Sequence, residues 1–207
     1  MGSYKGPSCK LCRREGVKLY LKSDRCDSPK CSFERRKYVP GQHGPVSRVK
    51  LSEYGIRLRE KQKVRRFYCL SEGQTRRYYE TANAMHGDTG EEMLQLMESR
   101  LDNVVYRMGL SDTRKQSRLI VRHGHIRVNG RKVDIPSYIL KVNDVILLRE
   151  KSLKSFEPVL IKARKRKLPN WLTADYDGNM YVYARVPSRE ELDVPVNEQF
   201  VIEFYSR

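Results

Sequence analysis

The chain has 207 residues, of which 42 are Lys or Arg and 25 are Asp or Glu, so its formal net charge is +17. A charge of this size favours a polyanionic partner, either nucleic acid or an anionic membrane surface. The longest unbroken apolar run is Met180 to Ala184, far below the ~20 residues of a membrane span. The first residues, Met1 to Pro7, contain no apolar stretch that resembles a signal peptide. We therefore expect a cytoplasmic protein without a membrane segment.

The sequence of the first half of the chain predicts an irregular lobe followed by helices. Residues 1–45 are rich in Cys, Gly, Pro and basic residues and show little periodicity. Residues 51–68 carry apolar residues at loose helical spacing, and residues 71–85 predict a second helix. The segment Thr89-Gly90-Glu91-Glu92 has the form of a capping box, so we expect one helix from residue 89 to residue 106 with a buried apolar stripe.

The second half mixes helices with short strands. A second capping box, Thr113 to Gln116, predicts a helix that ends at His123. The dipeptide Asn129-Gly130 between two alternating runs predicts a β-hairpin. Further elements follow along the chain: strands at residues 138–140 and 145–148, a helix at 154–167, a strand at 180–186, a helical turn capped by Ser188, and a last strand at 200–205.

The positive charge is unevenly distributed. Residues 1–66 hold 19 basic and 6 acidic residues, and residues 111–132 hold seven basic residues against Asp112 alone. Residues 187–207 instead carry more acidic than basic side chains. Such an asymmetry predicts an anion-binding front and a C-terminal end that faces a different partner.

Four of the five cysteines, Cys9, Cys12, Cys26 and Cys31, follow the spacing C-x2-C-x13-C-x4-C. Two close thiolate pairs can complete a tetrahedron, which favours one structural zinc ion. We expect nearby basic residues to lower the thiol pKa values and the metal to hold a lobe that lacks an apolar core. Disulfides, an iron–sulfur cluster and loose thiols are the alternatives, and Cys69 is interpreted as an ordinary buried thiol.

The helix at 113–123 and the hairpin after it predict a basic, concave surface. Arg114, Arg118 and Arg122 recur every four residues, which leaves Leu119 to Val121 to face the core. RNA duplexes are read through shape, phosphates and 2′-hydroxyls, which suits arginine forks beside a tight turn. The loop Pro40-Gly41-Gln42-His43-Gly44 is interpreted as a tight turn whose amides can meet phosphate rather than as a catalytic motif.

No catalytic signature is present, because the sequence contains no P-loop, no H-E-x-x-H and no G-x-S-x-G motif. The four histidines have no evident nucleophile partner, and His123 and His125 are predicted to be hydrogen-bonding residues. We therefore expect a binding protein and not an enzyme. An RNA-modifying enzyme and a zinc-dependent DNA-binding regulator remain as alternatives.

Five stretches of the sequence resemble the S-four family of bacterial small-subunit ribosomal proteins, in its zinc-bearing four-cysteine form. They are residues 9–16, 40–44, 58–63, 99–107 and 195–207. The resemblance implies a structural protein of the cytoplasmic small ribosomal subunit that binds 16S rRNA at a helical junction in the five-prime domain, nucleates assembly of the subunit body and contributes to translational accuracy. It also implies that residues 99–150 form the small RNA-binding module named after this family, which recurs in pseudouridine synthases and tyrosyl-tRNA synthetases.

The resemblance extends to partners and to site residues. In the family the C-terminal part meets ribosomal protein S-five, and basic residues after the Gly-Gln-His-Gly loop line the path of messenger RNA. Only Arg48 and Lys50 are basic there in this chain, so we do not expect strong unwinding of messenger RNA. The predicted RNA contacts are Arg13, Arg14, Arg35, Arg36, Gln42, His43, Arg48, Lys50, Arg59, Lys61, Arg65, Arg66, Arg100, Arg107, Arg114, Lys115, Arg118, Arg122, His123, His125, Asn129 and Arg131.

The predicted fold class is α+β. We expect a zinc-binding basic lobe at residues 1–45, a helical domain at 46–98, the helix–hairpin RNA-binding module at 99–150, and a mixed α/β C-terminal part at 151–207 that completes the globular body.

Overall fold

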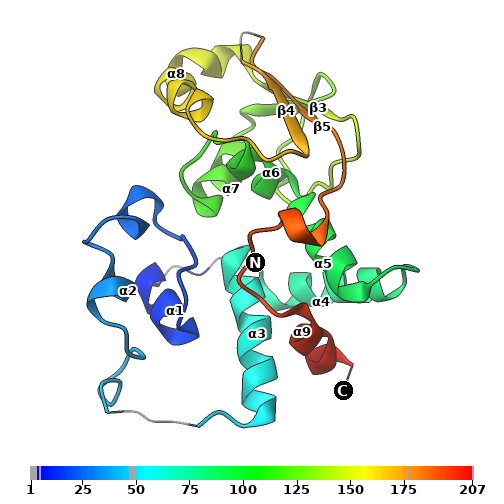
Figure 1. The fold of residues 1–207 in the computed structure, drawn as a ribbon. Helices are drawn as coiled ribbons and strands as arrows, with labels where there is room; N and C mark the ends of the chain where they lie inside the picture. Colours follow the sequence, from blue (N-terminus) through cyan, green and yellow to red (C-terminus); the bar gives the residue numbers. More distant parts are fainter. Residues whose placement is uncertain (1–3, 5, 47–49, 177, 207) are drawn as a thin grey trace. The chain divides into compact units, whose positions relative to one another are not determined.

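The computed structural model describes residue 4 and residues 6–46, 50–176 and 178–206 (Figure 1). The chain divides into two compact units, one formed by Met1–Met93 with Asp193–Arg207 and the other by Leu94–Leu192. The described residues form helices and one antiparallel sheet, which confirms the predicted α+β class. Within the described ranges, no helix is both long enough and apolar enough to cross a bilayer.

The first unit begins with a lobe of short helical segments joined by irregular chain. These are α1 (Ser8–Glu15), the 3-10 turn η1 (Ser23–Cys26) and α2 (Ser32–Arg35). Helix α1 ends where Gly16 adopts a left-handed conformation with φ of 68°, which glycine allows without steric cost. The lobe is thus less irregular than its composition predicts, although few of its residues are buried.

Two helices of the first unit confirm the prediction from periodicity. They are α3 (Glu53–Phe67) and α4 (Glu72–Asn83). The Ser52 hydroxyl caps α3 by accepting from the Gly55 amide at 3.2 Å. At the start of α4, the Ser71 hydroxyl accepts from the Gln74 amide and the Gln74 side chain accepts from the Ser71 amide, so the first turn is closed by a capping box.

The predicted strand at residues 200–205 is wrong, because this segment is helix α9 (Glu198–Tyr205). Its aromatic and β-branched residues favour strands in isolation. In the folded chain Val201 is fully buried, the Tyr205 ring stacks on Tyr79 with centroids 5.0 Å apart, and the Phe204 ring lies 4.3 Å from the Lys61 ammonium. Packing against α3 and α4 therefore outweighs the local preference.

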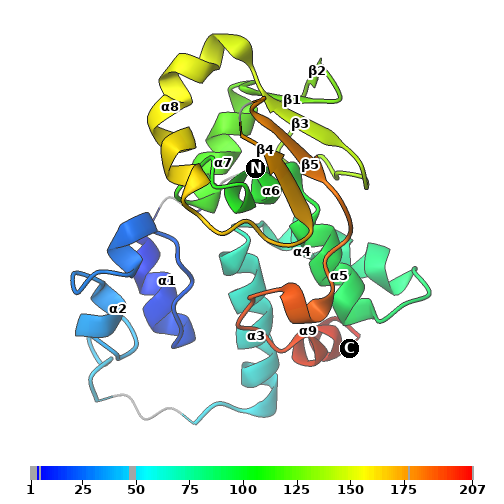
Figure 2. The same cartoon turned by 45° about the horizontal axis from the view of Figure 1, so that its top comes forward.

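The second unit is a five-stranded antiparallel sheet with helices beside it (Figure 2). The strand order is β2-β1-β3-β5-β4. Helix α5 (Thr89–Glu98) includes the boundary between the two units. The following elements of the second unit, in chain order, are α6 (Leu101–Arg107), α7 (Arg114–Arg122), β1 (Ile126–Val128), β2 (Arg131–Lys132), β3 (Val145–Leu148), α8 (Glu150–Arg164), β4 (Leu172–Asp175), β5 (Met180–Tyr183) and the 3-10 turn η2 (Arg189–Glu191).

The single helix predicted for residues 89–106 is in fact two helices, α5 and α6. The chain is extended at Arg100, with φ of −67° and ψ of 137°, and this residue forms an isolated β-bridge with Ile139. The Leu101 amide donates to the Tyr138 carbonyl at 2.8 Å, so hydrogen bonds to a distant segment replace those of a continuous helix. The cap of α5 also differs, because the Asp88 carboxylate, and not Thr89, accepts from the Glu91 amide.

Other elements also differ from prediction, among them the strand predicted for residues 180–186, which ends at Tyr183. Residues 138–140 contribute only the bridge at Ile139. Helix α8 begins at Glu150 rather than at residue 154 and contains Pro158, and β4 was not predicted. The capped turn at Ser188 is confirmed by hydrogen bonds with Glu191.

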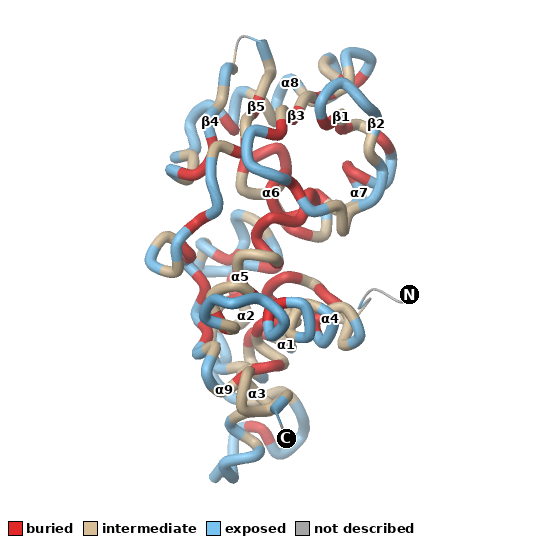
Figure 3. The backbone as a smooth tube through the Cα atoms, turned by 90° about the vertical axis from the view of Figure 1, so that its right-hand side faces the viewer, coloured by how far each residue is buried: buried red, intermediate tan, exposed pale blue. Residues whose placement is uncertain are grey.

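The core of the second unit lies between the sheet and helices α6 and α7. Buried residues of α6 such as Leu101 and Val104 pack with Ile126 and Ile146 of the sheet and with Trp171. Figure 3 shows this burial along α6, whereas the residues of β2 and of the turn before it are exposed. The unit therefore presents its hairpin and one side of α7 to solvent.

Candidate nucleic-acid interface

Helix α7 and the hairpin after it are joined by well-defined turns. The Thr113 hydroxyl caps α7 by accepting from the Gln116 amide at 3.2 Å. Asn129 and Gly130 have φ values of 49° and 78°, the left-handed pair that a two-residue hairpin requires. The Asn129 side chain donates to Asp144 at 2.8 Å and accepts from the Val145 amide at 2.9 Å. The predicted hairpin is confirmed, and its tip is fixed to the neighbouring strand.

The exposed part of this surface is basic. Arg122, His123 and Arg131 are exposed, and Lys115 and Arg118 are partly exposed. The Arg118 guanidinium lies 3.5 Å from the Asp102 carboxylate, with 28% of its side chain exposed. We call Lys115, Arg118, Arg122, His123 and Arg131 the α7–hairpin surface.

The prediction that Leu119 faces the core is wrong, since 51% of this residue is exposed. Ile120 and Val121 are buried as expected. An apolar side chain among exposed cations offers a contact for a ribose or base face, in addition to the charged groups that meet phosphate.

Three arginines of the second unit that were predicted to contact RNA are instead bonded to side chains within the unit. Arg100 is 1% exposed, and its guanidinium donates to both oxygens of Asp102 at 2.9 and 2.7 Å. Arg107 donates to both oxygens of the fully buried Glu98 at 3.0 and 2.7 Å. Arg114 is buried and donates to the Asn103 amide oxygen at 2.8 Å. Their contact with RNA stays a prediction, and the contacts that the structure shows for them are these bonds within the unit.

Four basic residues of α3 are likewise engaged within the protein. The Lys61 ammonium is buried and lies 2.8 Å from Glu72, and Arg65 reaches the same carboxylate at 3.3 Å. Burial alone would raise the pKa of Glu72, but hydrogen bonds from Lys61 and Tyr205 outweigh it and lower that pKa. Arg59 and Arg66 both pair with the buried carboxylate of Glu15.

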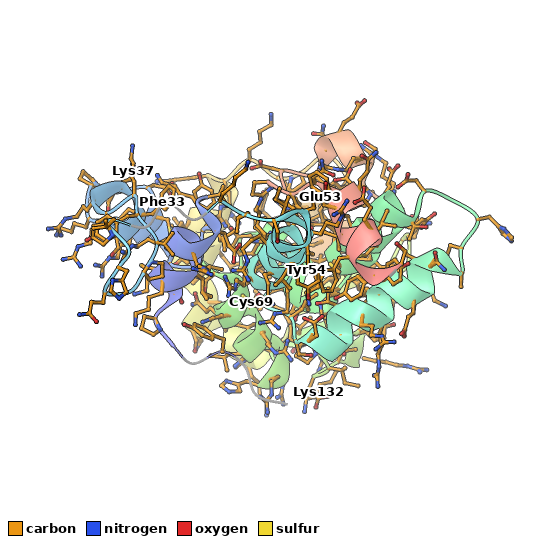
Figure 4. The ribbon with its side chains drawn as sticks, turned by 90° about the horizontal axis from the view of Figure 1, so that it is seen from below. Phe33, Lys37, Glu53, Tyr54, Cys69 and Lys132 are labelled. Carbon is orange, nitrogen blue, oxygen red and sulfur yellow. The ribbon has the colours of Figure 1, made fainter. Side chains whose placement is uncertain are left out.

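The N-terminal lobe places several predicted contacts in solvent. Arg14, Arg35, Arg36 and Lys50 are exposed, whereas Arg48 lies outside the described residues. Figure 4 shows Phe33 and Lys37 in this lobe, among side chains that project outward.

The loop at residues 40–44 is a tight turn, as predicted. The Gly44 amide donates to the Gly41 carbonyl at 3.2 Å, and Gln42 and His43 are exposed. A Cβ atom at Gly44 would lie 1.9 Å from the Val39 carbonyl oxygen, so this position requires glycine.

The four cysteines of the predicted zinc site line one cavity of about 10 Å³. Cys12, Cys26 and Cys31 are buried, and Cys9 is partly exposed. Over the described part of the chain, no set of three or more His, Cys, Asp or Glu side chains is arranged so that it could hold a metal ion. The sulfur chemistry and the small shared cavity fit zinc, but ligand geometry would require the side chains to close around the ion.

The expected lowering of the thiol pKa values is wrong for two of these cysteines. Burial raises the pKa of Cys12 and of Cys26, and repulsion from the neighbouring thiolates adds to the rise. The prediction for Cys69 is also corrected, since its side chain is only partly buried, with φ of 55°.

His125 is held as a hydrogen-bonding residue, as predicted. Its Nδ1 lies 2.8 Å from the Ser152 hydroxyl, and its ring packs against Phe156 with centroids 5.3 Å apart. Burial lowers the pKa of His125, and the charges of His123 and Arg149 lower it further. The lowered pKa favours the neutral form of the ring.

One basic segment escaped prediction. Five of the six residues from 162 to 167 are Lys or Arg, and all five are exposed at the end of α8. Lys162 pairs with Asp112 at 2.8 Å, and Arg166 lies 5.6 Å from the Tyr106 ring. The density of basic residues in this run could have identified it.

Comparisons with known proteins identify two family domains in the chain. Residues 3–98 match the family model described as "Ribosomal protein S4/S9 N-terminal domain", and residues 99–146 match the "S4 domain". The chain is 55% identical over 209 residues to "Small ribosomal subunit protein uS4" of Thermus thermophilus, 54% identical over 210 residues to the protein of that name from Thermotoga petrophila, and 53% identical over 209 residues to that of Acetivibrio thermocellus. Each of these matches covers 100% of both chains.

Proposed function

This chain belongs to the bacterial family of small ribosomal subunit protein uS4, and from this we propose that it is a structural component of the small ribosomal subunit that binds 16S rRNA. As such a component, it is located in the small ribosomal subunit. The relatives carry the names of ribosomal proteins and not of enzymes, so the RNA-modifying alternative is set aside.

The observation that carries this proposal is the α7–hairpin surface, which lies in the part of the chain that matches the RNA-binding module. A capped helix and a fixed hairpin tip hold its cations in place before RNA arrives. Cations on rigid elements grip phosphates at little entropic cost. We propose that they hold RNA helices in a fixed relation at a junction in the five-prime domain, and thereby nucleate assembly of the subunit body.

Salt-dependent binding tests this mechanism. We expect the full chain to bind a transcript of the 16S rRNA five-prime domain more tightly than duplex DNA at equal salt. The logarithm of the affinity should fall linearly with the logarithm of the salt concentration, because phosphate contacts release counterions. Affinity that does not respond to salt would refute charge neutralisation, and tighter binding of duplex DNA would favour the DNA-binding alternative.

We also propose that Cys9, Cys12, Cys26 and Cys31 hold one structural zinc ion. Their convergence on one small cavity supports this. The raised pKa values of Cys12 and Cys26 imply that binding would release protons from these thiols. Elemental analysis of freshly purified protein tests the proposal: we expect one equivalent of zinc, and less than half an equivalent would contradict it.

For the C-terminal region we propose contact with ribosomal protein S-five, through which the chain contributes to translational accuracy. A cavity of about 640 Å³ lies between α3, α4 and α9, and its lining combines the aromatic rings of Tyr54, Tyr79 and Phe204 with charged side chains. Aromatic centres with charged rims are typical of protein interfaces. Tyr54→Ala, at a ring that is 55% exposed, is expected to weaken binding of S-five without weakening RNA binding. For messenger RNA we propose a contact at Lys50 and Arg48.

A further inference from the structure

Cys9 lies between two cavities of the N-terminal lobe. One is the small sulfur cavity that all four cysteines line, and the other is a wider cavity of about 300 Å³. Of the four cysteines, only Cys9 lines both. It is also the partly exposed member of the set, whereas Cys12, Cys26 and Cys31 are buried. A reagent that enters the wider cavity from solution therefore meets Cys9 first.

The wider cavity is strongly cationic. Its charged lining residues are Lys10 and Arg13 of α1 with Arg35 and Arg36 of α2 and its end. Among the residues that the structure describes, no carboxylate lines this cavity, and Glu34 of the same segment pairs with Lys18 at 2.7 Å. A cavity lined by charges of one sign concentrates small ions of the opposite sign. The Cys9 thiol thus borders a cavity that attracts small anions.

Arg13 is held at the wall of this cavity by its neighbours. Its Nε donates to the Tyr38 carbonyl at 3.0 Å, and its Nη2 donates to the Val39 carbonyl at 3.4 Å. The guanidinium carbon lies 4.6 Å from the centroid of the Tyr38 ring. These hydrogen bonds use two of the five N–H groups of a guanidinium, and the others can bind a carboxylate.

Cys9 and Cys12 are placed so that they can form a dithiol pair. They are three residues apart on α1 and both line the sulfur cavity, so they share one face of the helix. Cβ atoms at this spacing are about 5–6 Å apart, and a disulfide requires about 3.5–4.5 Å. A small shift of the first turn of α1 therefore joins them. The spacing C-x-x-C is also that of the thioredoxin-type redox pair.

We propose that Cys9 and Cys12 are oxidised to a disulfide by small disulfides that carry carboxylates, and that the cationic cavity is where such a disulfide docks. The inference goes beyond the proposed function, because the reaction requires no RNA. Since both thiols also belong to the proposed zinc ligands, we expect any bound zinc to be released as the pair closes.

The reaction proceeds by two thiol–disulfide exchanges. The thiolate of Cys9 attacks one sulfur of the docked disulfide, whose S–S bond breaks, and one half leaves as a thiolate with the electron pair. Cys12, after losing its proton to solvent, attacks the Cys9 sulfur and displaces the second half as a thiolate. The two cysteines lose two electrons, and the small disulfide gains them.

Charged and neutral chromogenic disulfides test the docking step. The probes are dithiobis(nitrobenzoate), which carries a carboxylate on each half, and the neutral dithiodipyridine, each added to the full chain as purified at low salt. One-sign cavities raise association rates by roughly 10–10³-fold. We expect Arg35→Gln/Arg36→Gln to lower the rate with dithiobis(nitrobenzoate) by about tenfold and to leave the rate with dithiodipyridine almost unchanged.

The matched control is Arg76→Gln/Arg77→Gln, which removes the same charge from exposed positions on α4. We expect its rates with both probes to resemble those of the wild-type chain. An equal decrease in the two variants, or an equal decrease with the two probes, would overturn docking by the charge of the cavity. An unchanged rate for the cavity variant with dithiobis(nitrobenzoate) would overturn it as well.

Peptide masses identify the thiols in the wild-type chain, without a variant that has to fold. Trypsin cuts after Lys10, so a disulfide between Cys9 and Cys12 joins the peptides of residues 6–10 and 11–13. We expect this linked pair before any other cysteine reacts. First modification of Cys69, or a stable adduct on Cys9 without the link, would overturn the dithiol assignment. The linked peptides are measured without zinc or RNA, so failure of this proposal is distinguishable from failure of the proposed function.

Discussion

Replacing Glu98 with alanine removes the acceptor at the break between α5 and α6. The carboxylate is fully buried. It accepts hydrogen bonds from Nε and Nη2 of Arg107, at 3.0 and 2.7 Å, and from the side-chain amide of Asn103. Breaking a buried ion pair costs about 3–5 kcal/mol, since it leaves a charge without its counterion. The Arg107 side chain is 18% exposed and can recover part of its hydration, so we expect a loss near the lower limit, about 3 kcal/mol.

Tryptophan fluorescence measures this loss of unfolding free energy in the second compact unit. Trp171 is the single tryptophan of the chain and is 1% exposed in the core of the second unit, so its emission during urea unfolding reports on that unit. Glu98→Gln keeps the shape and one acceptor oxygen, and should cost about 1–2 kcal/mol. Asp134→Ala is the control: its partner Lys132 lies 3.5 Å away and both side chains are more than half exposed, so the loss should stay below about 0.5 kcal/mol.

A loss below about 1 kcal/mol for Glu98→Ala would refute the reasoning, because the buried ion pair would then contribute little to the stability of the second unit. The same conclusion would follow if Glu98→Ala and Asp134→Ala were equally destabilising.

Three further predictions concern the site residues. Cys12→Ser should abolish zinc binding and unfold the N-terminal lobe, measured by metal content and circular dichroism, while Trp171 emission stays unchanged. Arg118→Ala should weaken RNA binding and lower the salt slope by about one unit if the guanidinium meets a phosphate. His125 has a lowered pKa in the folded chain, so the unfolded state binds more protons than the folded state as the pH falls. The contribution of His125 to the free energy of unfolding should therefore be fully present above the ordinary histidine pKa and should decrease as the pH falls below it. Unfolding midpoints followed by Trp171 emission measure this decrease.

Each of these has a result that would count against it. A Cys12→Ser chain that retains a full equivalent of zinc would remove this cysteine from the ligand set. An unchanged slope for Arg118→Ala would assign Arg118 to its ion pair with Asp102 alone. If His125→Asn kept the wild-type dependence of stability on pH below pH 6.5, another group would be responsible.

Local chemistry predicted the hairpin and most helices correctly. Asn129-Gly130 forms a two-residue turn because few other pairs adopt left-handed φ values twice in succession. The helices at 51–68 and 71–85 appear as α3 and α4, each with a serine hydroxyl that caps its first turn. These features depend on residues that are close in sequence, which is why pattern and propensity suffice.

Long-range contacts account for the two main errors. Helix α9 was predicted as a strand, yet Tyr205 donates to Glu72 across 133 positions, and no window of sequence contains that partner. The break between α5 and α6 depends on two hydrogen bonds to a distant segment: the Leu101 amide donates to the Tyr138 carbonyl, and the Leu140 amide donates to the Ser99 carbonyl. The apolar stripe of this segment is compatible with one helix or two, so periodicity could not choose.

The sequence by itself determined that this protein carries a surplus of positive charge, where that charge is concentrated, and that a four-cysteine lobe precedes a helix–hairpin module. Only the tertiary structure decided which cations face solvent. Lys61 and Arg114 are as basic as Arg122 or Arg36, but they are buried with polar partners from other helices. The physical reason is that a cation in the interior requires a partner there, and the fold, not the local sequence, brings that partner within reach.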